Sequence, residues 1–209
     1  MSKVKKRRPV YGVGLNDYEY PVHFLKDGKI SRCQFYSVWI DILKRCYDKK
    51  CQEKQPTYAG CSIVAEWLSF KTFREWMQSQ PWNGNQIDKD ILIKGNKVYG
   101  PDTCVFISKS LNLFISGWGN KPNGLPLGVC FDSKNNKYRA QCKNYFTGKN
   151  EALGRFRCEF SAHSAWKNKK KEMCLAYAAE QSDPRVVKSL LDIYSELSKK
   201  GVYVHERRS

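Results

Sequence analysis

Residues 137–143 have the sequence KYRAQCK, and their strict alternation decides the fold of the second half of the chain. Successive side chains of a β-strand point to opposite faces of the sheet. One face of this strand carries Tyr138, Ala140 and Cys142, whereas the other carries three cations and an amide: Lys137, Arg139, Gln141 and Lys143. We therefore expect the first face to pack on a helix and the second to meet solvent.

Further strand and turn signals surround this stretch. Residues 127–131 form a short apolar run, residues 133–136 (SKNN) favour a hairpin turn, and a third strand is expected to end at 153–156. A helical pattern follows over residues 161–180. The second half of the chain is thus predicted to be a three-stranded antiparallel sheet packed on a helix.

The N-terminal half has a mainly helical pattern. Apolar residues at helical spacing predict helices over 34–47 and from Ser69 to just before Pro81. A strand over 87–93, a turn at 94–97, a strand that returns to Ile107 and a helix capped by Ser108 are expected next. These elements place a ββα arrangement at the end of the N-terminal half.

Together these patterns predict the α+β class. The clearest linker is SGWGNKPNG, because glycine, proline and asparagine favour turns over regular structure. Asp183 followed by Pro184 marks the start of a last helix, which is expected to run to Lys200. The predicted segments are a flexible basic arm, a ββα domain, a linker, a sheet-and-helix domain, and a C-terminal helix with its tail: 1–10, 11–115, 116–124, 125–181 and 182–209.

The net charge of the chain indicates which class of partner it binds. The 209 residues include 37 Lys and Arg against 20 Asp and Glu, which gives a net charge of +17. A magnitude of about 2–8 is enough to keep a small domain soluble. We therefore expect a nucleic-acid partner, with a merely solvated basic surface as the alternative. The sequence has no apolar run long enough to span a membrane and no export signal, so an intracellular protein without a membrane partner is expected.

Cysteine and histidine limit the chemistry. The nine cysteines are scattered without a CxxC pair, so we expect reduced thiols within the cores and no zinc site. The three histidines are His23, His163 and His205, and none lies in a recognisable nucleophile or metal motif. A hydrolytic reaction would have to proceed without an obvious histidine base.

The cationic face of residues 137–143 suits double-stranded DNA. The major groove admits a β-ribbon, and arginine and glutamine match the edges of guanine and adenine. The alternative is an ordinary solvated sheet face. The N-terminal sequence MSKVKKRRPV supplies further candidate phosphate contacts, with a solvated tail as the alternative: Lys5, Lys6, Arg7 and Arg8.

Residues 125–166 resemble the Apetala-type (plant ethylene-response-factor-like) DNA-binding domain as it occurs in phage endonucleases. The matching features are Gly128-Val129, KYRA at 137–140, LGRF at 153–156, and the helix from Ala162 to Trp166. The resemblance implies that the sheet enters the major groove while the helix supports its back. By position it makes Gln141 and Lys143 candidate DNA contacts, and Arg155 within the LGRF stretch is a further candidate. Four positions depart from the arginine or tryptophan of plant members: Cys130, Asp132, Asn150 and Ala152.

Residues 87–112, IDKDILIKGNKVYGPDTCVFISKSLN, resemble the ββα-metal core of HNH homing endonucleases. The resemblance implies Mg²⁺ or Mn²⁺ held by Asp88 or Asp90 and by Asn112, with Asn96 as the loop residue. Lys89 stands where that family has its histidine base. An ordinary lysine with a pKa of about 10.4 is protonated at pH 7 and cannot accept a proton. In the alternative interpretation, the aspartates are solvated strand-edge charges.

The two resemblances together cover roughly residues 11–175 and lead to one preferred hypothesis. They imply a phage-type HNH homing or nicking endonuclease, or a derivative of one, that acts on double-stranded DNA in the cytoplasm of an infected bacterial cell. A second hypothesis is a non-catalytic DNA-binding regulator or interference factor that keeps the nuclease scaffold. A third is an RNA-binding protein. No oligomeric state follows from the sequence.

Overall fold

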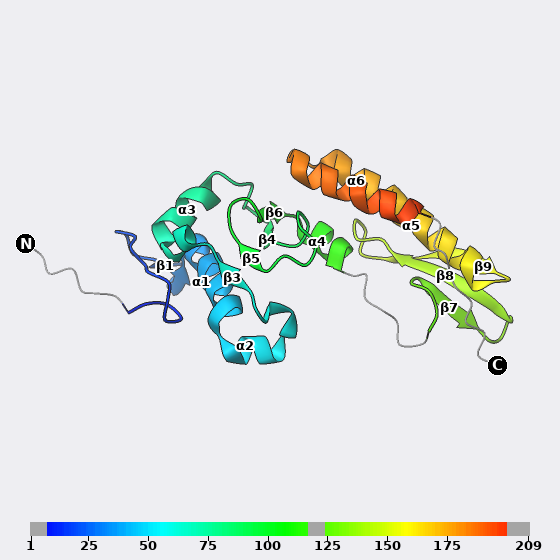
Figure 1. Ribbon diagram of the computed structural model, residues 1–209, viewed down its shortest axis with the longest axis horizontal. Helices are drawn as coiled ribbons and strands as arrows, with labels where there is room; N and C mark the ends of the chain where they lie inside the picture. Colours follow the sequence, from blue (N-terminus) through cyan, green and yellow to red (C-terminus); the bar gives the residue numbers. More distant parts are fainter. Residues whose placement is uncertain (1–7, 117–123, 200–209) are drawn as a thin grey trace, which may run out of the picture. The chain divides into compact units, whose positions relative to one another are not determined.

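The computed structural model describes residues 8–116 and 124–199 (Figure 1). The chain divides into two compact units, residues 1–109 and 110–209. The predicted linker, 116–124, lies almost wholly outside the described residues, as does the tail 200–209. The boundary between the units comes before this linker because α4 (Lys109–Ser116) packs within the second unit, where Phe114 lies 5.1 Å from Tyr177, ring centre to ring centre.

Helices form the core of the first unit. Its elements are β1 (His23–Lys26), β2 (Lys29–Arg32), α1 (Gln34–Tyr47), α2 (Lys49–Lys54), the 3₁₀ helix η1 (Pro56–Tyr58), β3 (Ser62–Ile63), the 3₁₀ helix η2 (Ala65–Leu68), α3 (Phe70–Gln78), β4 (Gln86–Asp88), β5 (Val98–Tyr99) and β6 (Val105–Ile107). The predictions of α1 and α3 are confirmed. Ser69 caps α3 by accepting a hydrogen bond from the backbone N–H of Thr72.

Aromatic side chains at helical spacing fill this core. Trp39 on α1 and Phe70 and Phe73 on α3 are fully buried. The indole N–H of Trp39 donates to the carbonyl oxygen of Trp67 at 2.7 Å, which satisfies its polar atom inside the core. The core holds α1 and α3 together and supports the strands that follow them.

The strand predicted over 87–93 is wrong in length, since β4 ends at Asp88. The reason is local: one oxygen of the Asp88 carboxylate accepts hydrogen bonds from the backbone N–H groups of Asp90 and Ile91, which turns the chain out of the strand. The returning strand is split in two. β5 pairs in parallel with β3, and β6 pairs antiparallel with β4.

The second unit confirms the predicted three-stranded antiparallel sheet packed on a helix, and with it the α+β class. The sheet has the order β7 (Val129–Asp132), β8 (Lys137–Lys143), β9 (Asn150–Phe156), and α5 (Glu159–Glu180) packs on it. Val129, Ala140 and Ala162 form a fully buried cluster between sheet and helix. The last helix, α6 (Pro184–Ser198), is capped by Asp183 as predicted, and it packs on α5.

Candidate functional site

The predicted two-faced strand β8 is present. Ala140 and Cys142 are buried and Tyr138 is half-buried against the helix side. On the other face Lys137, Arg139 and Lys143 are exposed, and Gln141 is half-buried. Backbone alternation therefore aligns these four candidate side chains on one surface, which we call the outward sheet face.

Neighbouring strands add residues to the outward sheet face. Arg139 is paired with Arg155 on β9 and with Cys130 on β7. Opposite residues of an antiparallel pair lie on the same face, with Cβ atoms about 4.5–5.5 Å apart. The sheet thus brings two arginine side chains side by side at the centre of this surface.

A β-bulge keeps Arg155 on this side. The register of β8 and β9 shifts between Ala140 and Gln141, so that Gly154 pairs with Ala140 whereas Ala152 pairs with Gln141. Leu153 is the extra residue, and it packs against the cluster under the sheet. Because of the bulge, Ala152 and Arg155 share the outward face although three positions separate them.

One acid lies on the outward sheet face, and its role was missed from the sequence. The Asp132 carboxylate accepts hydrogen bonds from the Asn135 side-chain amide at 2.9 Å and from Arg155 Nε at 3.0 Å. The hydrogen bond from Asn135, followed by that from Arg155, lowers the pKa of Asp132. Asp132 ends β7 directly opposite Lys137, a pairing that only the register of the strands reveals. Arg155 is therefore partly neutralised, whereas no hydrogen bond or ion pair with the described residues involves the charged ends of Lys137 and Arg139.

The helix under the sheet contributes less positive charge to solvent than its sequence indicates. Lys169 forms an ion pair with Glu151 at 2.9 Å. Lys170 is buried, and its ammonium nitrogen lies 4.4 Å from the ring centre of Phe114 and 5.1 Å from that of Tyr145. Burial lowers the pKa of Lys170. Its charge is held inside the unit by aromatic faces and is not presented to solvent.

The N-terminal arm lies mostly outside the described residues. Lys5, Lys6 and Arg7 belong to that part, whereas Arg8 is described and exposed. Their proposed contact with phosphates stays a prediction.

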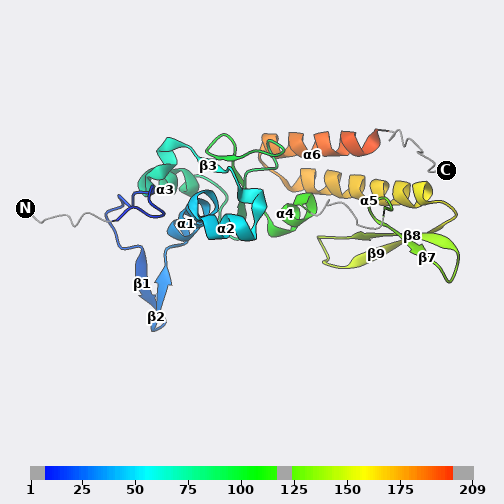
Figure 2. The same ribbon diagram turned by 60° about the horizontal axis from the view of Figure 1, so that its bottom comes forward.

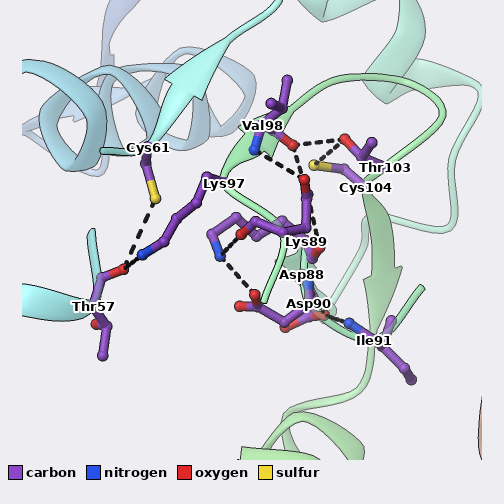
Figure 3. A network of polar contacts seen from close by, with 11 residues as sticks. Thr57, Cys61, Asp88, Lys89, Asp90, Ile91, Lys97, Val98, Thr103 and Cys104 are labelled. Atoms are coloured by element: carbon purple, nitrogen blue, oxygen red, sulfur yellow. Dashed lines mark hydrogen bonds and ion pairs between the residues drawn. The ribbon is translucent and has the colours of Figure 1, made fainter. Parts of the chain in front are cut away.

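The predicted catalytic cluster centres on Lys89 (Figure 3). The lysine is buried, and its ammonium group donates to a carboxylate oxygen of Asp90 at 2.7 Å and to the backbone carbonyl of Asn96 at 2.6 Å. The side chain of Asp90 is 52% exposed, whereas that of Lys89 is 7% exposed. The lysine thus bridges the end of β4 and the loop before β5 from the inside.

Asn96 is used to shape the same loop. Its side-chain amide donates to the carbonyls of Lys89 and Val98, at 3.0 and 2.7 Å, and its oxygen accepts from the backbone N–H of Val98 at 3.0 Å. Thr103 also donates to the Val98 carbonyl, at 2.7 Å. Asparagine side chains commonly form such local bonds in turns. The structure brings Asp88, Lys89, Asp90 and Asn96 together in one network.

Asp88 is not a solvated edge charge, because only 9% of the residue is exposed. Burial raises the pKa of its carboxyl group, and the backbone N–H groups of Ile91 and Asp90 oppose that shift. Asn112 lies on α4, which belongs to the second unit. Its backbone carbonyl accepts a hydrogen bond from the hydroxyl of Ser116.

This donor set does not fit a divalent cation. A hard cation needs several oxygen ligands, usually carboxylates with water or phosphate. Here one oxygen of Asp88 is taken by two backbone N–H groups, and the lysine ammonium lies against Asp90. Among residues 8–116 and 124–199, no group of three or more His, Cys, Asp and Glu side chains is placed to hold a metal ion.

The cysteines of the first unit form part of its core. Cys46, Cys61 and Cys104 are buried and not in disulfides. Burial raises the pKa of Cys46 to about 12 and that of Cys104 to about 11, so both are neutral thiols at pH 7. These thiols behave as small core residues, as predicted.

Comparisons with models of protein families, with curated proteins and with solved structures found no match to this chain. Within the described ranges, none of the helices is both long and apolar enough to cross a bilayer.

Proposed function

We propose that this protein binds double-stranded DNA by placing the outward sheet face of β7–β9 in the major groove. The observation that carries the proposal is the alignment of Lys137, Arg139, Gln141 and Lys143 on one side of β8, with Arg155 beside Arg139. Asp132 is the one acid among the residues of the three strands that face outward, and Arg155 and Asn135 already occupy its carboxylate.

The length of β8 supports this mode of binding. Six residue steps of about 3.4 Å place Lys137 and Lys143 about 20 Å apart. The major groove is about 12 Å wide. The two terminal lysines would therefore reach the phosphates on either side of the groove, while Arg139 and Gln141 would lie over the base edges between them. Arginine paired with guanine and glutamine paired with adenine are the bidentate contacts that such a position favours.

Duplex DNA suits this surface better than duplex RNA. The major groove of A-form RNA is deep and too narrow for side chains to read. The same strand could meet duplex RNA only across the shallow minor groove. There, arginine and glutamine side chains have few differences between base pairs to recognise. We therefore place the RNA-binding hypothesis behind the DNA-binding one.

The arrangement around Lys89 favours a non-catalytic DNA-binding protein over an active nuclease. The lysine ammonium donates to Asp90 and to the Asn96 carbonyl, and so carries a positive charge into the place where the nuclease hypothesis requires a metal ion. Asn96 is likewise committed to three backbone partners. Asp88, Lys89, Asp90 and Asn96 each form at least one hydrogen bond that holds the loop, which supports a structural role for the cluster.

Binding is tested with the double variant Arg139→Ala/Lys143→Ala and a fluorescein-labelled mixed-sequence duplex. Each lost phosphate contact should flatten the slope of log affinity against log salt by about 0.9, and affinity should fall tenfold or more at about 0.1 M salt. The matched control is Lys188→Ala/Lys199→Ala, which removes two exposed lysines at α6 and should leave the affinity nearly unchanged. Equal effects of the two double variants would refute the proposal that the outward sheet face binds DNA.

Cleavage is tested separately with supercoiled plasmid in the presence of Mg²⁺ or Mn²⁺. We expect binding without nicking. If the plasmid is nicked and Asp88→Asn/Asp90→Asn abolishes the nicking, the protein is a nuclease and the non-catalytic interpretation is wrong.

A further inference from the structure

The hairpin of β1 and β2 is a second surface with the character of a DNA-binding element. Its two strands are joined at Asp27 and Gly28, whose φ angles of 51° and 72° give the left-handed turn that suits a two-residue hairpin loop. Figure 2 shows the hairpin extending away from α1 and α3, two helices of its own unit. Its base is fixed by the buried Val22, whose carbonyl accepts from the N–H of Cys33 at 2.8 Å.

The apolar side chains of the hairpin are turned to solvent. Leu25 and Ile30 are paired across the strands, and they are 77% and 79% exposed. Phe24, on the opposite face, is 48% exposed. A two-stranded ribbon that exposes apolar residues on both faces gains little stability from burial, so these residues are better explained by a partner than by the fold.

The charges of the hairpin identify the kind of partner. Lys26 and Lys29 lie directly opposite each other, and Arg32 stands opposite His23 at the base. Like charges across a strand pair are destabilising. Asp27 is the one acid of the hairpin, and it lies in the turn. A row of anions along the ribbon, such as the phosphates that line a DNA groove, would relieve the repulsion between the lysines.

We propose that the β1–β2 hairpin is a second DNA-contacting element that enters a groove of the duplex. Lys26 and Lys29, which share the face of Phe24, contact the phosphates of one groove wall, while the Leu25–Ile30 pair on the other face packs against sugars and base edges of the opposite wall. Apolar side chains on basic elements are a known means of contact with groove walls and base steps. This inference rests on the proposed function, because it assigns a second contact to the same duplex.

Two variants separate the two kinds of contact on the full-length protein with the same labelled duplex. Lys26→Gln/Lys29→Gln should weaken binding tenfold or more at about 0.1 M salt and flatten the salt slope by about 0.9 per contact. Leu25→Thr/Ile30→Thr should weaken binding severalfold at an unchanged salt slope, since an apolar contact releases no counterions. Threonine keeps the β propensity of these exposed positions.

Two controls keep the result interpretable. Lys49→Gln/Lys50→Gln removes two exposed lysines on α2 of the same unit and should leave affinity almost unchanged. A third hairpin variant replaces residues 24–31 with Gly-Ser and keeps the anchored base. It should show both losses at once, with an unchanged urea midpoint for the rest of the unit.

The outcomes distinguish this inference from the proposed function. If Arg139→Ala/Lys143→Ala weakens binding but all hairpin variants bind like wild type, the hairpin inference is overturned and the sheet assignment stands. That result would also point to a protein partner for the hairpin. If the hairpin variants weaken binding and the sheet variant does not, the inference holds and the sheet assignment fails. If the wild-type protein does not bind duplex DNA, both are wrong.

Discussion

Gly128 lies where the second unit has no room for a side chain, and its replacement gives a sharp test of the packing under the three-stranded sheet. Its φ angle is +79°, and a Cβ atom at this position would run into the side chain of Trp166 on α5. Trp166 is 6% exposed and stacks on His163, with ring centres 5.3 Å apart. The indole therefore cannot move aside without disturbing the junction of β7 and α5.

The cost of Gly128→Ala has two parts. A residue with a Cβ atom in the left-handed region costs about 1–2 kcal/mol. Forcing extra atoms into a packed core costs about 1–3 kcal/mol more. The free energy of local opening of the second unit should thus fall by about 2–5 kcal/mol. The matched control is Gly148→Ala, where φ is +71° but no heavy atom lies within 4 Å of the added Cβ, so that only the first part applies.

Hydrogen exchange followed by mass spectrometry measures this difference in the unit itself. Every 1.4 kcal/mol corresponds to a tenfold change in an equilibrium constant, so peptides from β7 to β9 should exchange about 30-fold to several thousand-fold faster in Gly128→Ala. In Gly148→Ala the increase should be about 5- to 30-fold. Equal exchange in the two variants would refute the packing argument, because the clash with Trp166 is the one feature that separates them.

Two further predictions concern the polar network and pH. Lys89→Met keeps the buried stem but removes the ammonium group, so the Asn96 carbonyl loses its donor and the first unit should lose about 1–3 kcal/mol, as measured by urea unfolding. Asp90→Asn should cost less than about 1 kcal/mol because its side chain is half exposed, and equal losses would contradict the structural role given to Lys89. Burial, as the leading cause, lowers the pKa of His163 below its ordinary value of about 6.5, while the hydrogen bond to the Leu127 carbonyl opposes the shift. Below about pH 6.5 the unfolded chain therefore binds a proton that the folded chain does not, and stability should fall as the pH is lowered from about 7.5 to about 5.5. His163→Asn should reduce this pH dependence of the urea midpoint, and an undiminished dependence would show that another group is responsible.

The second unit could be predicted well because its sequence signals are local and repeated. The period of two in residues 137–143 fixes both the strand and its faces, and the Asp183–Pro184 pair fixes the start of α6. The ion pair between Asp132 and Arg155 depends on the register of three strands, and hence on contacts that no local pattern contains. The burial of Lys170 is likewise decided by three aromatic residues far apart in sequence, Phe114, Tyr145 and Trp166.

The first unit was harder to predict because side-chain hydrogen bonds override its strand pattern. Residues 87–93 have apolar residues in strand-like positions, yet Asp88 ends the strand by binding the backbone ahead of it. Nor does the sequence show that Lys89 lies inside the loop, since one lysine between two aspartates is typical of a surface. The β1–β2 hairpin has a clear turn signal at Asp27 and Gly28, but its exposed apolar residues follow no pattern of burial.

The extra residue in β9 has a consequence for how the outward sheet face can change. Leu153 is an extra residue in β9 without a partner on β8. Because of it, Ala152 and Arg155 lie on the same face of the sheet although they are three positions apart. Deletion of this single leucine would restore an unbroken ladder with Ala152 and Arg155 two positions apart and still on the same face, whereas a regular ladder that kept Leu153 would send one end of β9 to the opposite side of the sheet, because the side-chain period is two. Arg155 would then face α5, or Ala152 and Asn150 would. The bulge in β9 therefore determines which of its side chains lie on the outward sheet face.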